Sequence, residues 1–327
     1  MRIQHTHIGG QAVIEGIMMR GRYNWAIAVR SADGEIHTEE HDLHRVALTR
    51  KWLRWPLVRG VWGLYETMVL AMRAFSVSAK LAGETEDEQL TDAEVGWTMV
   101  LGLLLAIGLF TVLPAFLAKW LVGRPDDHVF LWNLTNGGMR LVVFFAYIWA
   151  VSRMKEIQRV FAYHGAEHKT IHAYEHGLPL EAPVIQRYET MHVRCGTSFL
   201  LMVMVVAIAV YMLVPIKQIL MGAGVASGLL ATVVTILIHI LLLPPIAGIA
   251  YEVIKWAGGR SEHPAVRVLL WPGLMLQKMT TREPDDSMVE VAVAAMSLVV
   301  AREEREAGGP VAEAVDAAPE VALADAP

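Results

Sequence analysis

The sequence has 327 residues, enough for one large or two small domains, and 54% of them are hydrophobic, mostly in continuous blocks. Its formal net charge of −5 gives no support to a nucleic-acid partner, and its single cysteine, Cys195, excludes an intrachain disulfide. Residues 1–6 lack the apolar core of a cleaved signal peptide, so we expect internal helices to drive insertion into a lipid bilayer.

The first 96 residues mix two kinds of local pattern. Alternating side chains in residues 25–30, then Asp33-Gly34, then residues 35–39 predict a β-hairpin with a type I′ turn. Residues 56–80 predict a helix that lies in the membrane interface or packs against a helical bundle.

The glycine-rich run 9–21 precedes that hairpin. Its glycines permit close backbone approach, and Glu15 is a carboxylate in an apolar setting, which makes Glu15 a candidate catalytic residue. The alternative is a structural turn in which Glu15 pairs with Arg20 or Arg22.

Four uncharged or nearly uncharged segments predict transmembrane helices: residues 97–121, 139–152, 199–216 and 223–250. The second is short and would have to borrow apolar residues from 129–134 or thin the bilayer. In the fourth, His239 is an ionisable group at membrane depth, and Pro244-Pro245 is expected to break the helix.

Basic residues indicate the orientation of these helices. Of 28 Lys and Arg residues, eleven precede residue 97, six lie in 153–198 and seven follow from Lys255 onward. Four spans place all three segments on one side, which the positive-inside rule assigns to the cytosol. We therefore predict a multi-pass protein of the cell inner membrane with both termini cytosolic.

The most informative segment is the histidine-rich run 163–176. On a helix, its polar side chains fall within a sector of about 140°. The sector contains His164, Glu167, His168, His172 and Glu175. Imidazoles at i and i+4 can share one cation, and a carboxylate between them can activate a water.

Two further ligands follow before the third span. A site built from His164, His168 and either His192 or Cys195 would have a common zinc ligand set, with Glu167 as the catalytic carboxylate. The alternative is a solvated helix face near anionic headgroups, with Cys195 as a small buried hydrophobic residue.

Other acidic residues are weaker site candidates. Asp285 or Asp286 is expected to cap a helix that begins near residue 288, while membership of an active site is the alternative for both and for Glu283. Glu252, at the cytosolic membrane boundary, could complete a site or pair with Lys255 or Arg260.

Several of these segments together resemble the YqhQ-like family of bacterial membrane proteins. The resemblance runs from about residue 9 to residue 296 and rests on segments 9–21, 163–172, 194–199, 242–256 and 280–286. It implies a multi-pass inner-membrane protein of the kind described as a predicted metal-dependent enzyme, without an established substrate. It implies nothing for the tail after residue 303.

The sequence therefore predicts a mainly α, polytopic membrane bundle with a small cytosolic α+β portion. The expected segments are 1–96 (hairpin and interfacial helix), 97–152 (first helix pair), 153–198 (His-rich loop), 199–256 (second helix pair), 257–302 (cytosolic or re-entrant) and 303–327 (disordered tail). One hypothesis is a hydrolase using Zn²⁺ or another divalent metal. A second is a non-enzymatic membrane factor whose cytosolic motifs hold the fold together or dock a protein partner. A third is a transporter-like role, suggested by His239 and the expected break in the fourth span.

Overall fold

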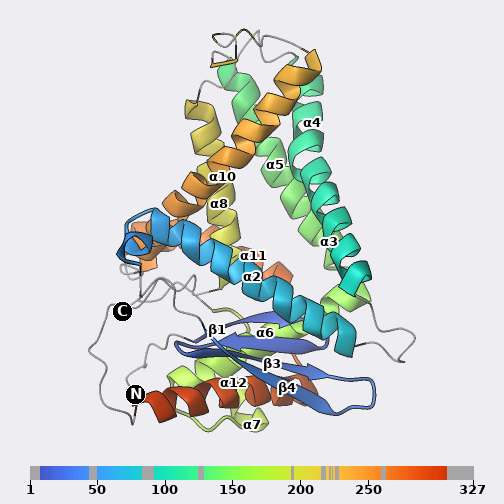
Figure 1. The fold of residues 1–327 in the computed structure, drawn as a ribbon, viewed down its shortest axis with the longest axis vertical. Coiled ribbons are helices and arrows are strands. Elements are labelled where there is room, and N and C mark those ends of the chain that lie inside the picture. Colours follow the sequence, from blue (N-terminus) through green and yellow to red (C-terminus); the bar gives the residue numbers. More distant parts are fainter. Residues whose placement is uncertain are drawn as a thin grey trace.

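The computed structural model describes residues 8–43, 50–82, 92–123, 129–192, 195–214, 219–220, 222, 224, 228–258 and 263–307. Figure 1 shows two parts: long helices that rise together, and a small sheet with its own helices at their lower end. The described chain is thus mainly helical with a small α+β portion, as the sequence predicts.

The sheet has four antiparallel strands in the order β1-β2-β3-β4. They are β1 (Gly9–Val13), β2 (Gly16–Arg20), β3 (Asn24–Arg30) and β4 (Ile36–Asp42). The predicted hairpin corresponds to β3 and β4, whereas the hairpin of β1 and β2 is an addition that the sequence pattern does not predict. Glu15, in the β1–β2 turn, has a φ of 50°, which costs a residue with a side chain about 1 kcal/mol.

The β3–β4 turn differs from the predicted type I′. That turn requires a positive φ at both central residues, but Gly34 has a φ of 88° and Asp33 has no positive φ. The Gly34 N–H donates to the Ser31 carbonyl at 2.9 Å, and Ser31 and Glu35 close the loop at 3.0 Å. The Asp33 carboxylate accepts hydrogen bonds from the Ser31 hydroxyl and the Glu35 N–H, which fixes this three-residue loop.

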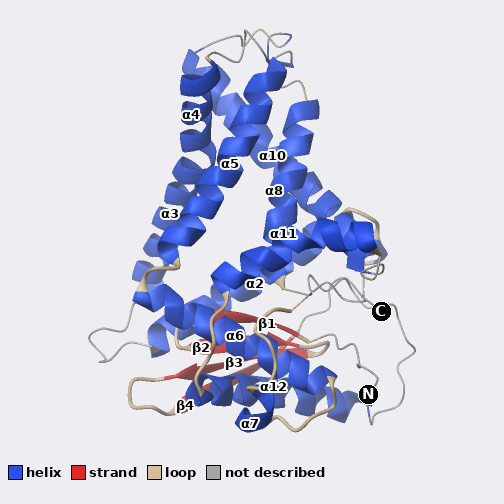
Figure 2. Ribbon diagram, turned by 180° about the vertical axis from the view of Figure 1, so that it is seen from behind, coloured by secondary structure: helices blue, strands red, loops and turns tan. Residues whose placement is uncertain are grey.

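Helices cover both faces of the sheet (Figure 2). Because successive strand residues point to opposite faces, β2 and β3 contribute to two cores. One core includes Ile17 and Met19 and is formed with α6 (Lys155–Glu175) and α12 (Asp286–Ala307). The other includes Ile27 and is formed with Leu70 of α2 (Val58–Leu81). The α2 helix therefore lies between the sheet and the bundle.

Four helical segments are long and apolar enough to cross a membrane: Gly96–Val122, Phe130–Val151, Gly196–Leu213 and Val233–Ala257. They belong to α3 (Asp92–Ile107) with the π-turn η2 (Gly108–Val112) and α4 (Leu113–Val122), to α5 (Val129–Val151), to α8 (Gly196–Leu213) and to α10 (Gly228–Gly258). Large apolar side chains on them are exposed, such as Leu241 at 76%. Exposed apolar side chains of this kind fit a lipid environment.

Prolines lie within two of these spans. The expected break at Pro244-Pro245 is wrong, since α10 continues through both prolines. Helices in a bundle tolerate this loss of backbone hydrogen bonds because neighbouring helices and local adjustments compensate. In the first span, Pro114 is the second residue after the π-turn, which makes room for its ring.

The second predicted span is part of a longer helix in the structure. The α5 helix begins at Val129 and so includes the apolar residues that the short segment 139–152 had to borrow. The third span begins at Gly196, three residues before the predicted start.

Two further helices lie where the two parts meet: η1 (Lys51–Arg54) and α11 (Pro264–Thr280). The short helix α7 (Ala182–Ile185) instead packs against α6 and α12, at the end of the sheet portion away from the bundle (Figure 1). The α11 helix packs closely on α8, because a Cβ on Gly273 would lie 2.7 Å from Ser198 Oγ. The start of α2 packs equally closely on α10, where a Cβ on Gly60 would lie 2.6 Å from Tyr251 Cβ. These contacts attach the α+β part to the bundle.

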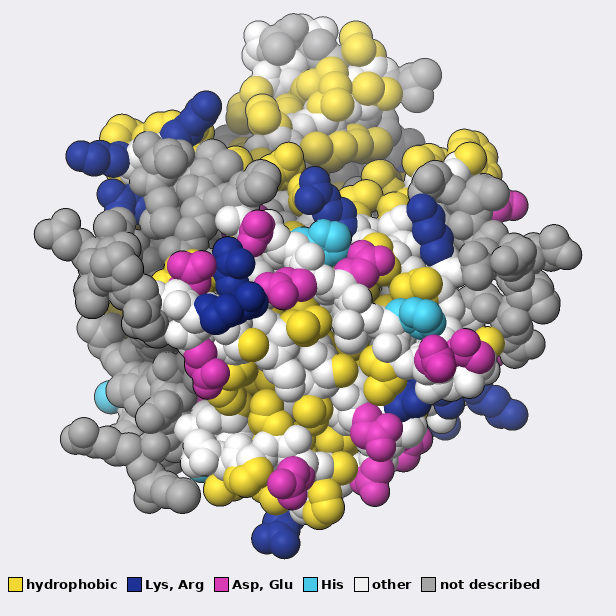
Figure 3. All heavy atoms as spheres, turned by 60° about the horizontal axis from the view of Figure 1, so that its bottom comes forward, with side chains coloured by type: hydrophobic (Ala, Val, Ile, Leu, Met, Phe, Trp, Pro, Cys, Tyr) yellow, Lys and Arg dark blue, Asp and Glu magenta, His cyan; other side chains and the backbone are white. Residues whose placement is uncertain are grey.

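The sheet, α6 and α12 lie together at one end of the bundle (Figure 1). Seen from that end, acidic and basic side chains are interspersed over the surface, with the apolar bundle behind (Figure 3). The predicted tail from residue 303 overlaps α12 as far as Ala307, and its remainder lies outside the described residues.

Candidate metal centre

The histidine-rich run forms α6, which confirms the helix assumed for it. Most of this helix is buried against the sheet, α12 and the 280–282 segment, and its residues Glu167 and His168 are only 5% and 1% exposed. The alternative of a solvated helix face is therefore wrong for these two residues. Polar groups buried to this degree need partners or a function.

His164 and His168 are held in the same tautomer by backbone carbonyls. The Nδ1 atom of His164 lies 2.8 Å from the Thr280 carbonyl oxygen, and that of His168 lies 2.6 Å from the Thr190 carbonyl oxygen. Because a carbonyl can only accept, both Nδ1 atoms carry the proton and donate it. Each Nε2 atom is then left with the lone pair that a metal needs, the arrangement that metal-ligating histidines usually adopt.

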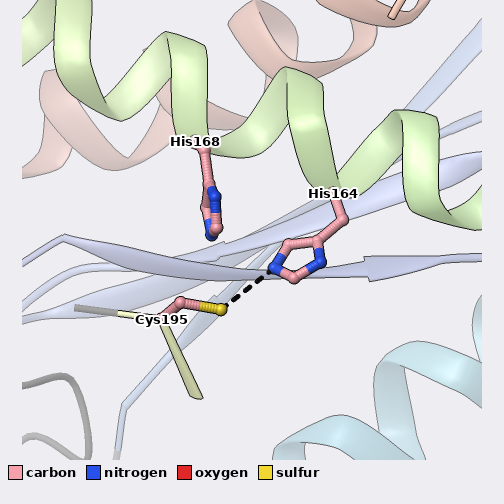
Figure 4. A group of neighbouring side chains, drawn as sticks. All are labelled: His164, His168 and Cys195. Atoms are coloured by element: carbon pink, nitrogen blue, oxygen red, sulfur yellow. Dashed lines mark hydrogen bonds between the residues drawn. The ribbon is translucent and has the colours of Figure 1, made fainter. Parts of the chain in front are cut away.

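Cys195 faces the two imidazoles from the start of α8 (Figure 4). Its Sγ lies 3.2 Å from His164 Nε2 and 3.1 Å from Thr197 Oγ1. As the N-cap of α8, the sulfur also accepts a bond from the Thr197 N–H. A helix N-terminus favours a thiolate, which is the form of cysteine that binds metals.

The donor atoms of His164, His168 and Cys195 all lie within 4.8 Å of one another. The two rings are 4.4 Å apart between centroids, as expected for residues one helical turn apart. Nitrogen and sulfur ligands of one tetrahedral zinc ion stand about 3.6 Å apart, close to the 3.2 Å between His164 and Cys195. The donor set therefore fits a zinc-like cation after a small adjustment.

A cavity of about 380 Å³ adjoins these donors. His164, Glu167, His168 and Cys195 all line it. The Glu167 carboxyl receives a hydrogen bond from the Gly10 backbone, while its Oε2 is buried and has no hydrogen-bond partner among the described residues. A Cβ on Gly10 would lie 2.9 Å from Glu167 Oε1, so only glycine lets β1 approach this carboxyl.

The protonation equilibria of the site follow from its burial. Burial raises the pKa of Glu167 to about 8 and lowers the pKa of His168 to about 4. For Cys195, burial acts to raise the thiol pKa, but the neighbouring His168 and the hydrogen bonds with Thr197 outweigh it, so the pKa is lowered. Neutral imidazole and thiolate are the forms that coordinate metals.

Comparison with known proteins places the chain in a family. A family model described as "Protein of unknown function (DUF1385)" matches residues 55–302. The chain belongs to this family. It is also 32% identical over 306 residues to the "Uncharacterized protein YqhQ" of Bacillus subtilis (strain 168), a match that covers 87% of this chain and 89% of that protein. No solved structure matches the chain.

The resemblance drawn from the sequence motifs is thereby confirmed, and all three candidate ligands lie within the residues that match this DUF1385 family. The strands β1 and β2, including Gly10, precede the matched range.

His192 lies beside the three donors but groups with other residues. Its Nε2 is 3.3 Å from the Glu175 carboxylate, and donor atoms of His172, Glu175 and His192 lie within 4.8 Å of one another. His172 uses its Nε2 to donate to the Met191 carbonyl at 2.9 Å. Burial lowers the pKa of His192 to about 4. Of the two proposed third ligands, the structure thus places Cys195, not His192, with His164 and His168.

Glu15 approaches α6 but belongs to an ion pair. Its carboxylate binds Arg159 through two hydrogen bonds, one of 2.6 Å from Nε and one of 2.5 Å from Nη2. The Tyr163 hydroxyl donates to the same carboxylate at 3.3 Å. The expected partners Arg20 and Arg22 are wrong for Glu15, since Arg20 instead binds Glu66 of α2. Glu15 does not line the 380 Å³ cavity.

Glu252 also has a partner that the sequence did not indicate. Its carboxylate binds Arg59 of α2 at 2.6 and 2.8 Å and accepts the Leu57 N–H at 3.2 Å. Leu57 has a φ of 67°, an unusual conformation that this contact helps to hold. The expected pairing of Glu252 with Lys255 is not what the geometry shows, and Arg260 lies outside the described residues.

The acidic residues of the 280–287 segment act at the start of α12. Asp285 caps that helix, since its Oδ1 accepts the Met288 N–H at 3.0 Å, as predicted. Asp286 accepts a bond from Gln186 at 3.1 Å. Glu283 binds the buried Lys169 of α6 at 2.5 Å. All three are therefore engaged with neighbouring side chains or backbone.

Two residues that the sequence pattern missed position the site. Gln277 is fully buried in α11, where it donates to the His192 carbonyl and accepts the His192 N–H, both at 2.9 Å. Gly165 lets the 280–282 segment approach α6, because a Cβ there would lie 2.0 Å from the Arg282 carbonyl oxygen. Neither residue belongs to a sequence motif that predicts this role.

Proposed function

We propose that this protein is a membrane-embedded, metal-dependent hydrolase whose site lies where the bundle meets the sheet. The observation that supports this most strongly is the grouping of His164, His168 and Cys195, whose donor atoms lie within 4.8 Å beside a cavity. Three protein ligands with an open side are typical of catalytic zinc sites, whereas structural zinc sites use four.

Each ligand is prepared for coordination by groups of this chain. The carbonyls of Thr280 and Thr190 orient the two imidazoles, and Thr197 orients the sulfur. A divalent cation bound here would act as a Lewis acid toward a water or a carbonyl oxygen. The mixed nitrogen and sulfur set favours zinc over magnesium or calcium, which prefer oxygen ligands.

Glu167 is the group that would accept and return the proton. It lies one turn after His164 on the same helix and lines the same cavity, and its Oε2 has no hydrogen-bond partner among the described residues. Without a metal, the raised pKa keeps this carboxyl protonated at neutral pH, whereas a divalent cation beside it would favour the carboxylate. A carboxylate with an uncommitted oxygen can accept a proton from water and deliver it to a leaving amine or alcohol. The Gly10 backbone fixes the other oxygen, so that the carboxyl keeps one orientation.

The cavity walls favour an apolar substrate. Leu70 of α2, Ile171 of α6 and Leu200 of α8 line it together with the candidate ligands. Since α8 is one of the four candidate spans, the cavity borders the expected bilayer. A membrane-partitioned peptide, lipid-linked compound or hydrophobic amide is the class of substrate that fits these walls.

We propose further that the site faces the cytosol. The segments before α3, between α5 and α8, and after α10 gather at the sheet end of the bundle (Figure 1), and these segments hold most of the basic residues. The positive-inside rule assigns that end to the cytosolic side of the inner membrane.

The competing function is a non-enzymatic membrane factor whose polar residues hold the fold together. The ion pairs Glu15–Arg159 and Lys169–Glu283 on α6 favour it, because they link the sheet and the 280–287 segment to this helix. They do not use the three candidate ligands. Substitutions at the three candidate ligands alone therefore distinguish the two proposed functions.

The test is a pair of variants of the detergent-solubilised protein. His168→Ala should lose bound zinc, because it removes a coordinating nitrogen, whereas Glu167→Gln should keep zinc and lose zinc-dependent release of p-nitroaniline from a long-chain acyl p-nitroanilide. Replacing zinc by cobalt should give a thiolate charge-transfer band that Cys195→Ser removes. The non-enzymatic function predicts no zinc in the wild type and equal losses of stability in both variants.

A further inference from the structure

A second cavity lies within the apolar bundle, apart from the candidate metal centre. Its volume is about 310 Å³, near the lower end of the usual range for ligand pockets of about 300–1,000 Å³. All four candidate spans line it, mostly with apolar side chains such as Phe110, Phe144 and Leu243. The polar residues that line it are Thr111, Arg140, Tyr211 and His239.

Arg140 is the only one of these four that carries a permanent charge. It lies near the middle of the span Phe130–Val151, with its guanidinium carbon 5.0 Å from the centre of the Tyr211 ring. Its Nε is buried and has no hydrogen-bond partner among the described residues. A cation at this depth is costly unless it pairs with an anion or faces water.

No carboxylate among the residues that the structure describes pairs with Arg140, although other arginines near the membrane have such partners. Arg59, for example, binds Glu252 where α2 meets α10. A ring face supplies an attraction of about 1–2 kcal/mol to a guanidinium but no compensating negative charge.

Tyr211 and His239 do not supply the missing anion. The Tyr211 hydroxyl donates to the His239 carbonyl at 3.2 Å, so its proton is engaged. The His239 Nδ1 lies 2.7 Å from the Thr235 carbonyl and must donate to it, which leaves a neutral imidazole with its Nε2 as an acceptor. Arg140 forms a side-chain hydrogen bond with the neutral Tyr211, and the cavity thus holds a cation that no anion among the described residues balances.

We propose that this cavity binds the anionic head of an amphiphile, with a carboxylate or phosphate against Arg140 and the acyl chain along the apolar walls. Guanidinium groups bind both anions through paired hydrogen bonds, and the low dielectric of the bundle strengthens that attraction. The apolar side chains of α3, α8 and α10 exclude a freely hydrated ion as the preferred ligand.

This anion site is separate from the proposed metal centre. The two cavities share one lining residue, Leu200, which is 49% exposed. None of the polar residues at the anion site contacts His164, His168 or Cys195 in the described structure. The anion site can therefore exist whether or not the metal centre does.

The probes are palmitate and hexadecyl phosphate, with hexadecanol as the uncharged control, titrated into protein in a neutral detergent. Bound molecules are counted by native mass spectrometry. Arg140→Gln should weaken binding of both anions by about tenfold or more, because a charge-assisted pair is lost. The two anions distinguish a carboxylate ligand from a phosphate ligand by which binds more tightly.

The matched control is Arg153→Gln. Arg153 also lies over an aromatic ring, 4.8 Å from Trp149, but it follows the end of α5 and does not line the cavity. This variant should bind both anions within about twofold of the wild type, since the same charge is removed outside the site. Equal weakening by the two variants would show surface attraction and overturn the proposal, as would equally tight binding of hexadecanol.

Two further variants keep the test decisive if Arg140→Gln fails to fold. Ala207→Phe fills the cavity while retaining Arg140, so binding should be lost with the charge still present. Arg140→Lys keeps the charge and should retain most of the binding. Unchanged anion binding in Ala207→Phe would refute the cavity as the site. Zinc content is measured on every variant and should not change, because these substitutions lie outside the metal centre.

Discussion

Replacing Gly165 by alanine tests whether the 280–282 segment positions the candidate ligands. Gly165 follows His164 on α6, and a Cβ there would lie 2.0 Å from the Arg282 carbonyl oxygen. Real Cβ contacts essentially never fall below 3.0 Å, so the helix and the segment must separate by at least 3.0 − 2.0 = 1.0 Å. The obstacle is backbone, which cannot rotate away as a side chain can.

That separation acts directly on His164. The hydrogen bond from its Nδ1 to the Thr280 carbonyl is 2.8 Å long, and the neighbouring bond from the Arg282 N–H to the Phe161 carbonyl is 2.9 Å long. Lengthening either by about 1 Å breaks it. Loss of the bond that orients a metal-ligating histidine typically weakens metal binding by about 10–100-fold, and overpacking costs about 1–3 kcal/mol of stability.

The assay is the zinc Kd measured by competition with a chromophoric chelator, together with the apparent Tm in detergent. Gly196→Ala is the matched control, because Gly196 follows Cys195 and a Cβ there meets nothing within 4 Å. We expect the control to bind zinc within about twofold of the wild type. A Gly165→Ala protein with the wild-type Kd would refute the role of the Thr280 carbonyl, and so would equal weakening by both alanines.

Three further changes test other parts of the structure. Gln277→Leu leaves the buried N–H and carbonyl of His192 without their Gln277 partner. The free energy of unfolding should fall by about 2 kcal/mol or more and the apparent Tm by several degrees, and an unchanged Tm would contradict this. For Asp285, burial alone would raise the carboxyl pKa, but hydrogen bonds at the start of α12 lower it below its ordinary 3.8. The Asp285 carboxylate therefore stabilises the fold above pH 3.8, and this contribution is lost as the pH falls through the lowered pKa. Asp285→Ala should thus lower the free energy of unfolding by about 1 kcal/mol at pH 7 and leave it unchanged in strong acid. An equal loss in acid would contradict the capping role. Glu15→Gln should keep the zinc Kd within about twofold, since Glu15 pairs with Arg159; a tenfold loss would instead place Glu15 in the site.

Much of the bundle could be predicted from the sequence because each span is a continuous apolar block. Hydropathy located the first and third spans within about three residues. The second begins nine residues before its predicted start, because Asn133 and Asn136 interrupt its first turns, and the fourth is shifted by seven to ten residues toward the C-terminus. The hairpin of β3 and β4 was also predictable, since its side chains alternate. Its turn type was not, because Asp33-Gly34 is compatible with more than one loop and hydrogen bonds from Ser31 and Glu35 select the one formed.

The β1–β2 hairpin was missed for a different reason. Its glycines conceal the alternation of side chains that marks a strand, and Glu15 in its turn is not a residue that favours a positive φ. The contacts that hold this hairpin come from Arg159 and from Glu167, far away in the sequence. Tertiary contacts of that kind leave no local pattern.

The candidate site was partly predictable. Helical spacing alone brought His164 and His168 together, and proximity to the third span suggested Cys195. The choice of Cys195 over His192 depends on where α8 begins and on how Gln277 fixes the His192 backbone. The carbonyls that set the histidine tautomers are backbone atoms, and no side-chain pattern can reveal them.

The central claim is tested most directly by elemental analysis of the wild-type protein, purified in detergent without chelators and without a histidine tag. We predict about one equivalent of zinc or a similar transition metal per chain, because three donor groups converge within 4.8 Å beside an open cavity. His168→Ala prepared in parallel should retain less than about a tenth of that amount. Wild-type protein with only a trace of transition metal, which does not take up zinc when zinc is supplied, would contradict the metal centre and with it the proposed hydrolase.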